Sequence, residues 1–219
     1  MNGEPTNPSG GRRAHGPSHR TDTREKIIEA AASLIPELGW GDVSSRRVAE
    51  RAGVNTGVIH YHVGSIGELR RIAAVRRIRT FFLDRVGEAL AQPDPVVAVD
   101  TMLRVLSAHD PRDPELLLLY ESLVAASRDD QLRAEIATLL AEFRQWLCDW
   151  FAARGVARPL VVAMTLTAAI DGYLLQRSLD PSVEPGPLVD GLVGLVRQHL
   201  VPDTEPTSGD AGGAVPGGS

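Results

Sequence analysis

The chain of 219 residues contains a single cysteine and has no long apolar run. With only Cys148 available, an intramolecular disulfide is excluded, and nothing in the chain calls for an oxidising compartment. The longest apolar run, residues 160–170, is too short to span a bilayer. The N-terminal stretch also lacks the apolar core of a signal peptide. We therefore expect a cytoplasmic protein with no membrane partner.

The motifs of common helical enzymes are also missing. The chain has no HExxH metal motif, no Glu-x-x-His pair of the di-iron kind and no phosphate-cradling glycine loop. His60 and His62 are two residues apart, which on a helix places them on different sides, so a zinc site is not expected. We expect no catalytic residues, metal or cofactor. A helical enzyme remains the main rival class, because a fold alone does not fix function.

Residues 44–63, SSRRVAERAGVNTGVIHYHV, have the pattern of two short helices joined by a tight turn. Ser44 or Ser45 can cap the first helix, and Gly53 supplies the backbone freedom that the turn needs. Asn55 can cap the second helix. The pattern predicts a helix-turn-helix, although it also fits an ordinary helical hairpin.

The second of these helices has an apolar side and a polar side. Val58 and Ile59 can face inward, and Gly57 allows the start of the helix to approach a surface closely. The outer face then carries Thr56, Gly57, His60, Tyr61 and His62. Such a set of side chains suits a DNA groove.

The flanking residues favour the helix-turn-helix over the hairpin. Residues 23–38 have apolar positions at a helical period, which predicts a helix with one buried face that Gly39 ends. Residues 65–68, Ser-Ile-Gly-Glu, form a capping box that opens a further helix. Three helices are therefore expected before a long one.

Residues 24–69, REKIIEAAASLIPELGWGDVSSRRVAERAGVNTGVIHYHVGSIGEL, resemble the start of the TetR family of bacterial transcriptional regulators. The positions that carry the resemblance are Ile28, Ala31, Ala32, Gly39, Val48, Ala49, Ala52, Gly53, Val54, Tyr61 and Leu69. The resemblance implies an all-α protein. It would have an N-terminal three-helix DNA-binding domain with a helix-turn-helix, followed by a helical-bundle ligand-binding and dimerisation domain.

The family pattern also implies roles for individual residues. Base contacts would come from the start of the second helix and from Arg46, while Ser45, Tyr61 and His62 would mainly hold phosphates. The expected DNA-binding set is Ser45, Arg46, Asn55, Thr56, Gly57, Val58, His60, Tyr61 and His62.

Two positions depart from the family pattern. Val63 stands where the family usually has Phe, and Ile66 stands where it usually has a Lys that contacts a phosphate. The role of that Lys can pass to Arg70 or Arg71, or to the free backbone amides near Ser65 at the start of the next helix.

Charge is distributed unevenly along the chain. Residues 1–79 contain 13 Lys or Arg and 8 Asp or Glu, whereas residues 80–219 contain 10 and 20. Positive charge around the expected DNA-binding helix strengthens attraction to phosphates, and the acidic remainder argues against a general polyanion binder. A charge run is also compatible with a solvated face.

Composition and periodicity divide the chain into four parts. Residues 1–20 and 202–219 are rich in Gly and Pro without periodicity, so we expect a disordered basic arm and a disordered tail. The arm can reach a DNA minor groove or remain a solvated tail. The DNA-binding domain is expected at 21–65 and the regulatory domain at 66–201. Helical periods predict helices at 65–91, 95–108, 114–127, 130–154, 159–179 and 187–200.

The resemblance places an effector inside the regulatory domain. The helix at 130–154 carries an apolar and aromatic stripe that is mostly core, yet part of it can line a cavity. The residues expected there are Met102, Leu106, Tyr120, Leu123, Trp146, Trp150 and Asp171. Asp171 and Glu121 interrupt apolar surroundings, so each needs a partner, solvent or a ligand. If Asp171 joins Trp146 or Trp150 around a cavity, a cationic or hydrogen-bond-donating ligand is favoured.

Small and apolar residues in the helices at 159–179 and 187–200 fit close helix packing, either in the monomer's core or between two copies. The resemblance favours a homodimer through these helices, which would bind a roughly palindromic double-stranded operator. The leading hypothesis is a repressor that an unidentified small-molecule effector releases from DNA. The alternatives are a constitutive DNA-binding protein without an effector and a redox sensor based on Cys148.

Overall fold

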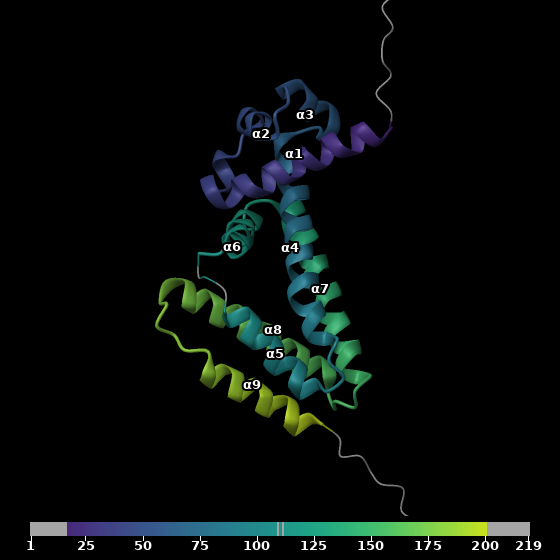
Figure 1. The fold of residues 1–219 in the computed structure, drawn as a ribbon, viewed down its shortest axis with the longest axis vertical. Coiled ribbons are helices and arrows are strands. Elements are labelled where there is room, and N and C mark those ends of the chain that lie inside the picture. Colours follow the sequence, from purple (N-terminus) through teal and green to yellow (C-terminus); the bar gives the residue numbers. More distant parts are fainter. Residues whose placement is uncertain (1–16, 109, 111, 201–219) are drawn as a thin grey trace, which may run out of the picture.

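The computed structural model describes residues 17–108, 110 and 112–200, and there the chain is built from α-helices (Figure 1). In chain order these are α1 (Pro17–Leu38), the short 3-10 helix η1 (Trp40–Asp42), α2 (Ser45–Ala52), α3 (Thr56–Val63), α4 (Ile66–Leu90), α5 (Pro95–Ser107), α6 (Pro114–Ala126), α7 (Asp130–Ala152), α8 (Pro159–Leu179) and α9 (Gly186–His199). The described residues form no strand, only one isolated bridge between Val156 and Leu200. The predicted all-α fold is confirmed.

Capping residues place most helix starts where the sequence predicts them. The Ser44 hydroxyl, rather than that of Ser45, accepts the backbone N–H of Arg47 at 3.4 Å and caps α2. The Asp94 and Asp113 carboxylates accept N–H groups in the first turns of α5 and α6, and each precedes a proline at the first helical position. Proline lacks the N–H that would be unsatisfied there, so the chain enters both helices without loss of a hydrogen bond.

One predicted helix start is wrong, and one predicted cap lacks its hydrogen bond. Helix α1 begins at Pro17, so residues 17–20, expected in a disordered arm, form its first turn. Proline is well suited to a first helical position, which accounts for the earlier start. Asn55 occupies the N-cap position of α3, but its side chain makes no capping hydrogen bond. The rest of the expected arm, residues 1–16, and the expected tail lie outside the described residues.

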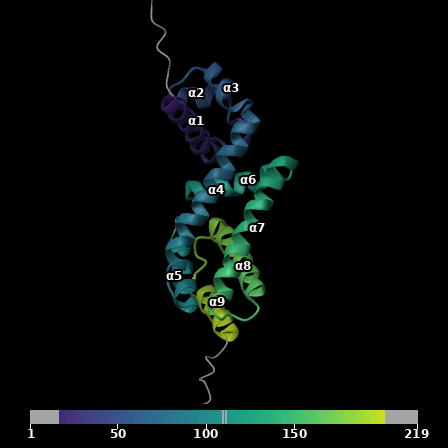
Figure 2. The same cartoon turned by 90° about the vertical axis from the view of Figure 1, so that its right-hand side faces the viewer.

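The helices form a head and a body that α4 connects (Figures 1 and 2). We call the N-terminal group, α1 to α3 with the first half of α4, the head. Its buried core includes Ile27, Ile35, Val48, Ile59 and Leu69. The same core also takes Leu118 from α6 and Leu132, Ile136 and Leu139 from α7. The sequence predicts a domain boundary between residues 65 and 66. In the structure, side chains from beyond this boundary pack in the same hydrophobic core as the head.

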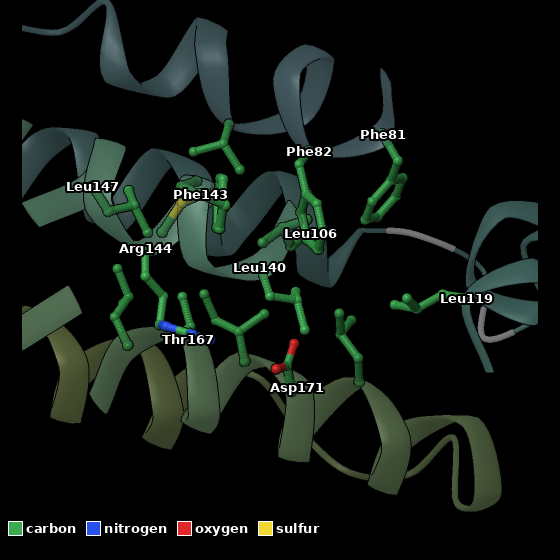
Figure 3. Close-up of a pocket in the computed structure, with 15 residues that line it drawn as sticks. Phe81, Phe82, Leu106, Leu119, Leu140, Phe143, Arg144, Leu147, Thr167 and Asp171 are labelled. Atoms are coloured by element: carbon green, nitrogen blue, oxygen red, sulfur yellow. The ribbon is translucent and has the colours of Figure 1, made fainter. Parts of the chain in front are cut away.

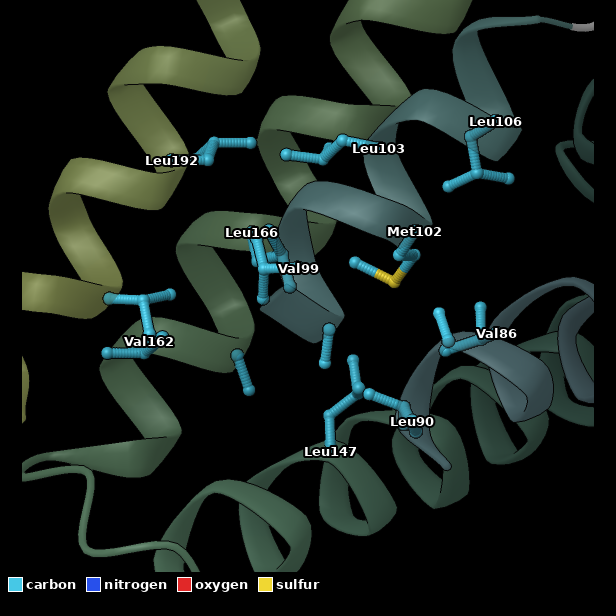
Figure 4. Packing of buried hydrophobic residues seen from close by; sticks show 14 of the residues in the cluster. Val86, Leu90, Val99, Met102, Leu103, Leu106, Leu147, Val162, Leu166 and Leu192 are labelled. Atoms are coloured by element: carbon cyan, nitrogen blue, oxygen red, sulfur yellow. The ribbon is translucent and has the colours of Figure 1, made fainter. Parts of the chain in front are cut away.

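The body consists of α5, α8 and α9 packed against the second halves of α4 and α7. Met102 from α5 is 1% exposed and lies among side chains from the surrounding helices (Figure 4). Leu147 of α7 and Leu166 of α8 belong to the same core. Helices α4 and α7 run through both cores, so a change in the body that moves them also reaches the head.

Candidate functional site

Helix α3 lies at the outer end of the head (Figure 1). Ile59 is fully buried and Val63 is 5% exposed, so these two side chains anchor the helix to the head. Val58 is half-buried, which is less than the sequence predicts. Thr56, Gly57, His60 and Tyr61 are exposed, and His62 is half-buried. The structure therefore brings most of the predicted outer residues of α3 onto one accessible surface.

The two histidines of α3 have different surroundings. Nδ1 of His60 lies 2.9 Å from the carbonyl oxygen of Gly64. Because a carbonyl oxygen only accepts hydrogen bonds, Nδ1 must carry the hydrogen, and Nε2 of the neutral ring is then an acceptor. The His62 ring lies edge-on to Tyr61, with centroids 5.2 Å apart. Among the described residues no group of three or more His, Cys, Asp or Glu could hold a metal ion.

Helix α2 is fixed to α1 by Arg51. Its guanidinium donates to both oxygens of Glu37, at 2.8 and 2.6 Å, and also to the hydroxyl of Ser33 at 3.0 Å. Hydrogen bonding from Arg51 lowers the pKa of Glu37. After α2, Gly53 has φ of 67°, a left-handed conformation that glycine adopts without strain. Arg46 is exposed and Ser45 is half-buried on the same helix.

Both arginines that could take over the role of the missing family lysine already have partners within the protein. Arg70 donates to the carbonyl oxygen of Trp40 at 2.6 Å, and its guanidinium lies 5.6 Å from the centre of the Trp40 ring. Arg71 pairs with Asp129 at 3.4 Å. Both side chains are half-buried and have a buried Nε atom, so neither points freely into solvent beside α3. The start of α4 near Ser65 remains the predicted phosphate contact.

Trp40 connects the head to α6 by a hydrogen bond, in addition to the packing of Leu118 in the head core. Its backbone N–H donates to Oε2 of Glu121 at 2.8 Å, while its carbonyl accepts from Arg70 of α4. This N–H is the first of η1, and the preceding Gly39 offers no side-chain cap. Glu121 therefore caps η1 from α6 and finds the partner that its apolar surroundings require. Gly39 has a φ of 82°, which residues with a side chain rarely adopt, and the carboxylate would lie at an ordinary van der Waals distance of 3.7 Å from an added Cβ.

A cavity of about 70 Å³ lies in the body between α4, α5, α6, α7 and α8 (Figure 3). Apolar side chains form most of its wall. Phe82 and Phe143 stack within this wall, with centroids 4.6 Å apart and an interplanar angle of 20°. Arg144, Thr167 and Asp171 are the polar lining residues.

Family models match both parts of the chain. The model described as bacterial regulatory proteins of the tetR family matches residues 27–71, which cover α2 and α3. The model described as the tetracyclin repressor-like C-terminal domain matches residues 93–202, which include most of the body. The chain belongs to the TetR family.

The similarity to individual TetR-like proteins covers most of the chain. A helix-turn-helix-type transcriptional regulator from Mycobacterium bovis is 27% identical over 177 residues, which cover 75% of this chain and 87% of that protein. A transcriptional regulator from Rhodococcus is 25% identical with a TM-score of 0.68, covering 82% of this chain and 99% of that one. The multidrug binding protein EbrR, solved with imidazole, is 28% identical with a TM-score of 0.67, covering 90% and 100%. The TetR chain described here is therefore a DNA-binding transcriptional regulator.

The cavity of this TetR protein includes only part of the predicted ligand set. Met102, Leu106 and Asp171 line it. Tyr120 and Leu123 do not line it, although Tyr120 lies near enough to Asp171 for the carboxylate to add to the rise that burial causes in the pKa of Tyr120.

The two tryptophans of α7 lie outside the lining as well. Trp146 is 37% exposed and does not line the cavity, but its ring packs beside the lining residue Phe143, with centroids 5.9 Å apart. Trp150 donates from Nε1 to the carbonyl of Leu90 at 2.8 Å, and Arg154 lies over its ring at 3.9 Å. These contacts hold the Trp150 side chain in the body core. The prediction that Trp150 lines the cavity is therefore wrong.

Sequence reasoning missed several lining residues, among them Phe82, Leu119, Leu140 and Arg144. On α7 the lining positions 140, 143, 144 and 147 have the spacing of one helical face. That spacing is a signal present in the sequence, but it does not tell which face of a helix meets a cavity. Cys148 is half-buried and packs against the body core.

Proposed function

We propose that this TetR-family chain is a cytoplasmic, homodimeric repressor that a small molecule in the body cavity releases from a palindromic operator. The observation that carries the proposal is the position of α6. Leu119 of α6 lines the cavity, and Glu121, two residues later, holds the backbone of Trp40 in the head. One rigid element therefore touches both the cavity and the DNA-binding unit.

The exposed face of α3 supplies the proposed DNA contacts. Thr56, Gly57, Val58 and His60 would meet base edges together with Arg46 of α2, whereas Ser45, Asn55, Tyr61 and His62 would hold or border phosphates. The acceptor Nε2 of His60 suits the exocyclic amino groups of adenine or cytosine. Tyr61 is 68% exposed, so its side chain is accessible to a DNA phosphate.

The size of the cavity supports release by displacement. Its volume of about 70 Å³ is well below the roughly 300–1,000 Å³ of ordinary ligand pockets, so a ligand must push lining side chains aside. Displacement of Leu119 would move α6, and with it the carboxylate that caps η1. The ligand would then favour a conformation with wrongly spaced heads, and it shifts the equilibrium only by its difference in affinity for the two states.

The outer side of α8 supports the proposed homodimer. Leu160, Met164, Leu175 and Leu179 recur at helical spacing and are all at least half exposed in the monomer. Among the described helices α8 also has the length and apolar composition of a membrane span. Its ionisable residues and its packing along α7 and α9 suit an interface between helices better. A second copy would bury this stripe and place two heads on related half-sites.

One experiment tests DNA recognition and release together. Duplexes bound by the full-length protein are selected from a random pool at moderate salt, and the selected operator is then titrated with candidate ligands. We expect enrichment of a two-fold symmetric sequence and loss of binding with a subset of ligands. No enrichment would contradict operator recognition, and enrichment of an operator that no ligand releases would favour a constitutive DNA-binding protein.

A further inference from the structure

We propose that the body cavity binds an amphiphilic organic cation, in which a slender apolar or aromatic part enters the cavity and one protonated amine pairs with Asp171. This inference rests on the proposed function, because it names the class of ligand for the same cavity.

Asp171 offers a carboxylate without a partner. It extends from α8 toward the cavity, opposite Leu140 (Figure 3). No hydrogen bond or ion pair joins it to any residue that the structure describes. Asp171 is an exposed residue that also lines the cavity, so its carboxylate lies where the cavity meets solvent. An amine at this edge would pair with the carboxylate while keeping part of its own hydration, which lowers the free-energy cost of binding a charge.

The surroundings of Asp171 favour a positive partner. Burial among apolar side chains raises the pKa of its carboxyl group, so a nearby cation would stabilise the ionised form. Deeper in the cavity the stacked rings of Phe82 and Phe143 and the side chains of Met102 and Leu106 provide an apolar wall. This wall suits the apolar part of the ligand and offers no further charge.

Arg144 is the other charged lining residue. It favours an anionic ligand less strongly than Asp171 favours a cationic one. Its side chain reaches toward Thr167 and is half-buried. A long, flexible arginine can move its guanidinium to solvent, whereas the short side chain of Asp171 keeps its carboxylate near the cavity. An anionic ligand would also have to lie beside that carboxylate. The two charges therefore select a cation over an anion of the same shape.

Three probes on one scaffold test the class of ligand: 4-phenylbutylamine, 4-phenylbutanol and 4-phenylbutyrate. Binding to the full-length dimer is measured by calorimetry and by fluorescence, since Trp146 contacts the wall residue Phe143. We expect the amine to bind at least tenfold more tightly than the alcohol, and the acid to bind most weakly. Asp171→Asn should reduce the affinity for the amine to that for the alcohol and leave the alcohol unchanged.

Two matched variants separate a local pairing from general charge effects. Asp190→Asn removes an equal charge from the exposed face of α9 and should leave all three affinities unchanged. Arg144→Gln should leave the affinity for the amine equal or higher. Tightest binding of the acid with loss in Arg144→Gln, equal binding of amine and alcohol, or no binding of any probe to the folded protein would each overturn the proposal.

Operator binding is measured in the same samples. Binding of the amine that depends on Asp171 but does not release DNA would contradict the proposed release mechanism and leave the ligand class standing. Release of DNA by other compounds, together with no binding of the amine, would contradict the proposed ligand class and leave the release mechanism standing. The failure of one proposal is therefore distinguishable from the failure of the other.

Discussion

Glu121 on α6 accepts a hydrogen bond from the backbone N–H of Trp40 across 2.8 Å, although 81 residues separate them in the chain. The same Trp40 accepts a hydrogen bond from Arg70 on α4. The junction between α1 and α2 is thus held by α4, which continues into the body, and by α6, which lines the body cavity with Leu119. A movement of α6 relative to α4 would strain one of these two hydrogen bonds, which makes Trp40 one point at which the cavity and the head are coupled.

Replacement of Glu121 tests this coupling point. Glu121→Ala leaves the half-buried N–H of Trp40 without its acceptor, so we expect a loss of about 1–3 kcal/mol in the free energy of unfolding. Glu121→Gln keeps an acceptor oxygen and should lose less. Hydrogen exchange at the Trp40 amide gives a local readout, with protection lost in the alanine variant and largely kept in the glutamine variant.

Glu142→Ala is the matched control for Glu121→Ala. Glu142 forms an exposed ion pair with Arg79 at 2.8 Å, and such pairs contribute about 1 kcal/mol or less. Equal destabilisation by the two alanine variants, or unchanged exchange at Trp40, would show that the Glu121 hydrogen bond has no special role.

The approach of α3 to DNA is tested at Gly57. A Cβ at this position would meet no atom within 4 Å in the monomer, and alanine is a better helix former by about 1 kcal/mol. Gly57→Ala should therefore leave the melting temperature equal or higher. The added methyl group would hold α3 away from the groove, and we expect operator affinity to fall by about tenfold, or about 1.4 kcal/mol. Fluorescence anisotropy with the selected operator measures this loss.

Gly87→Ala provides the comparison for Gly57→Ala. Gly87 lies within α4 and also has no atom within 4 Å of an added Cβ. The variant should gain similar helix stability without losing affinity for DNA. Equal operator affinities for both variants would contradict a close approach of α3 at Gly57.

The sequence alone was sufficient to predict features that depend on residues close together in the chain. Caps such as Ser44 and Asp94 involve residues two or three positions away, so helix starts could be predicted closely. Partners distant in the chain could not be predicted. Arg70 looked available for a phosphate because nothing near it in sequence indicates Trp40, which lies 30 residues away.

The candidate cavity was predictable only in part for a related reason. Periodicity shows which residues share a helical face, but not which face meets a cavity. Asp171 was found because a carboxylate in an apolar helix needs an explanation. Trp150 was misplaced because an aromatic side chain fits a core and a ligand site equally well, and its hydrogen bond to Leu90 spans 60 residues.

The carboxyl group of Asp171 should make stability depend on pH. Burial raises its pKa in the folded state above the ordinary value of 3.8 that applies when the chain is unfolded. Ionisation therefore destabilises the folded state, and this penalty appears as the pH rises from about 3.8 through the raised pKa. Asp171→Asn cannot ionise, so it should melt at a higher temperature than the parent at pH 7.

The gain from Asp171→Asn should shrink as the pH falls toward 3.8, since the folded parent is then protonated and the unfolded chain is increasingly so. Thermal unfolding between pH 4 and 7 measures the trend. Asp190→Asn changes the net charge equally on α9, away from the cavity, so the difference between the two variants isolates the effect of the apolar cavity on Asp171. A gain that is constant over this range, or larger at low pH, would contradict an ionised Asp171 beside an apolar cavity.

The apolar stripe of α8 predicts the effect of a charge on assembly. Met164 is 52% exposed in the monomer, so Met164→Glu should leave the monomer's fold intact. In a dimer the same carboxylate would be buried without a partner, at a penalty of several kcal/mol, and we expect monomers at micromolar concentration. Val97→Glu on α5, with 47% exposure, should remain dimeric in sedimentation velocity experiments. Because paired half-sites need paired heads, the monomeric variant should also lose most operator affinity. Dimers of both variants, or a monomeric parent, would place the interface elsewhere or exclude it.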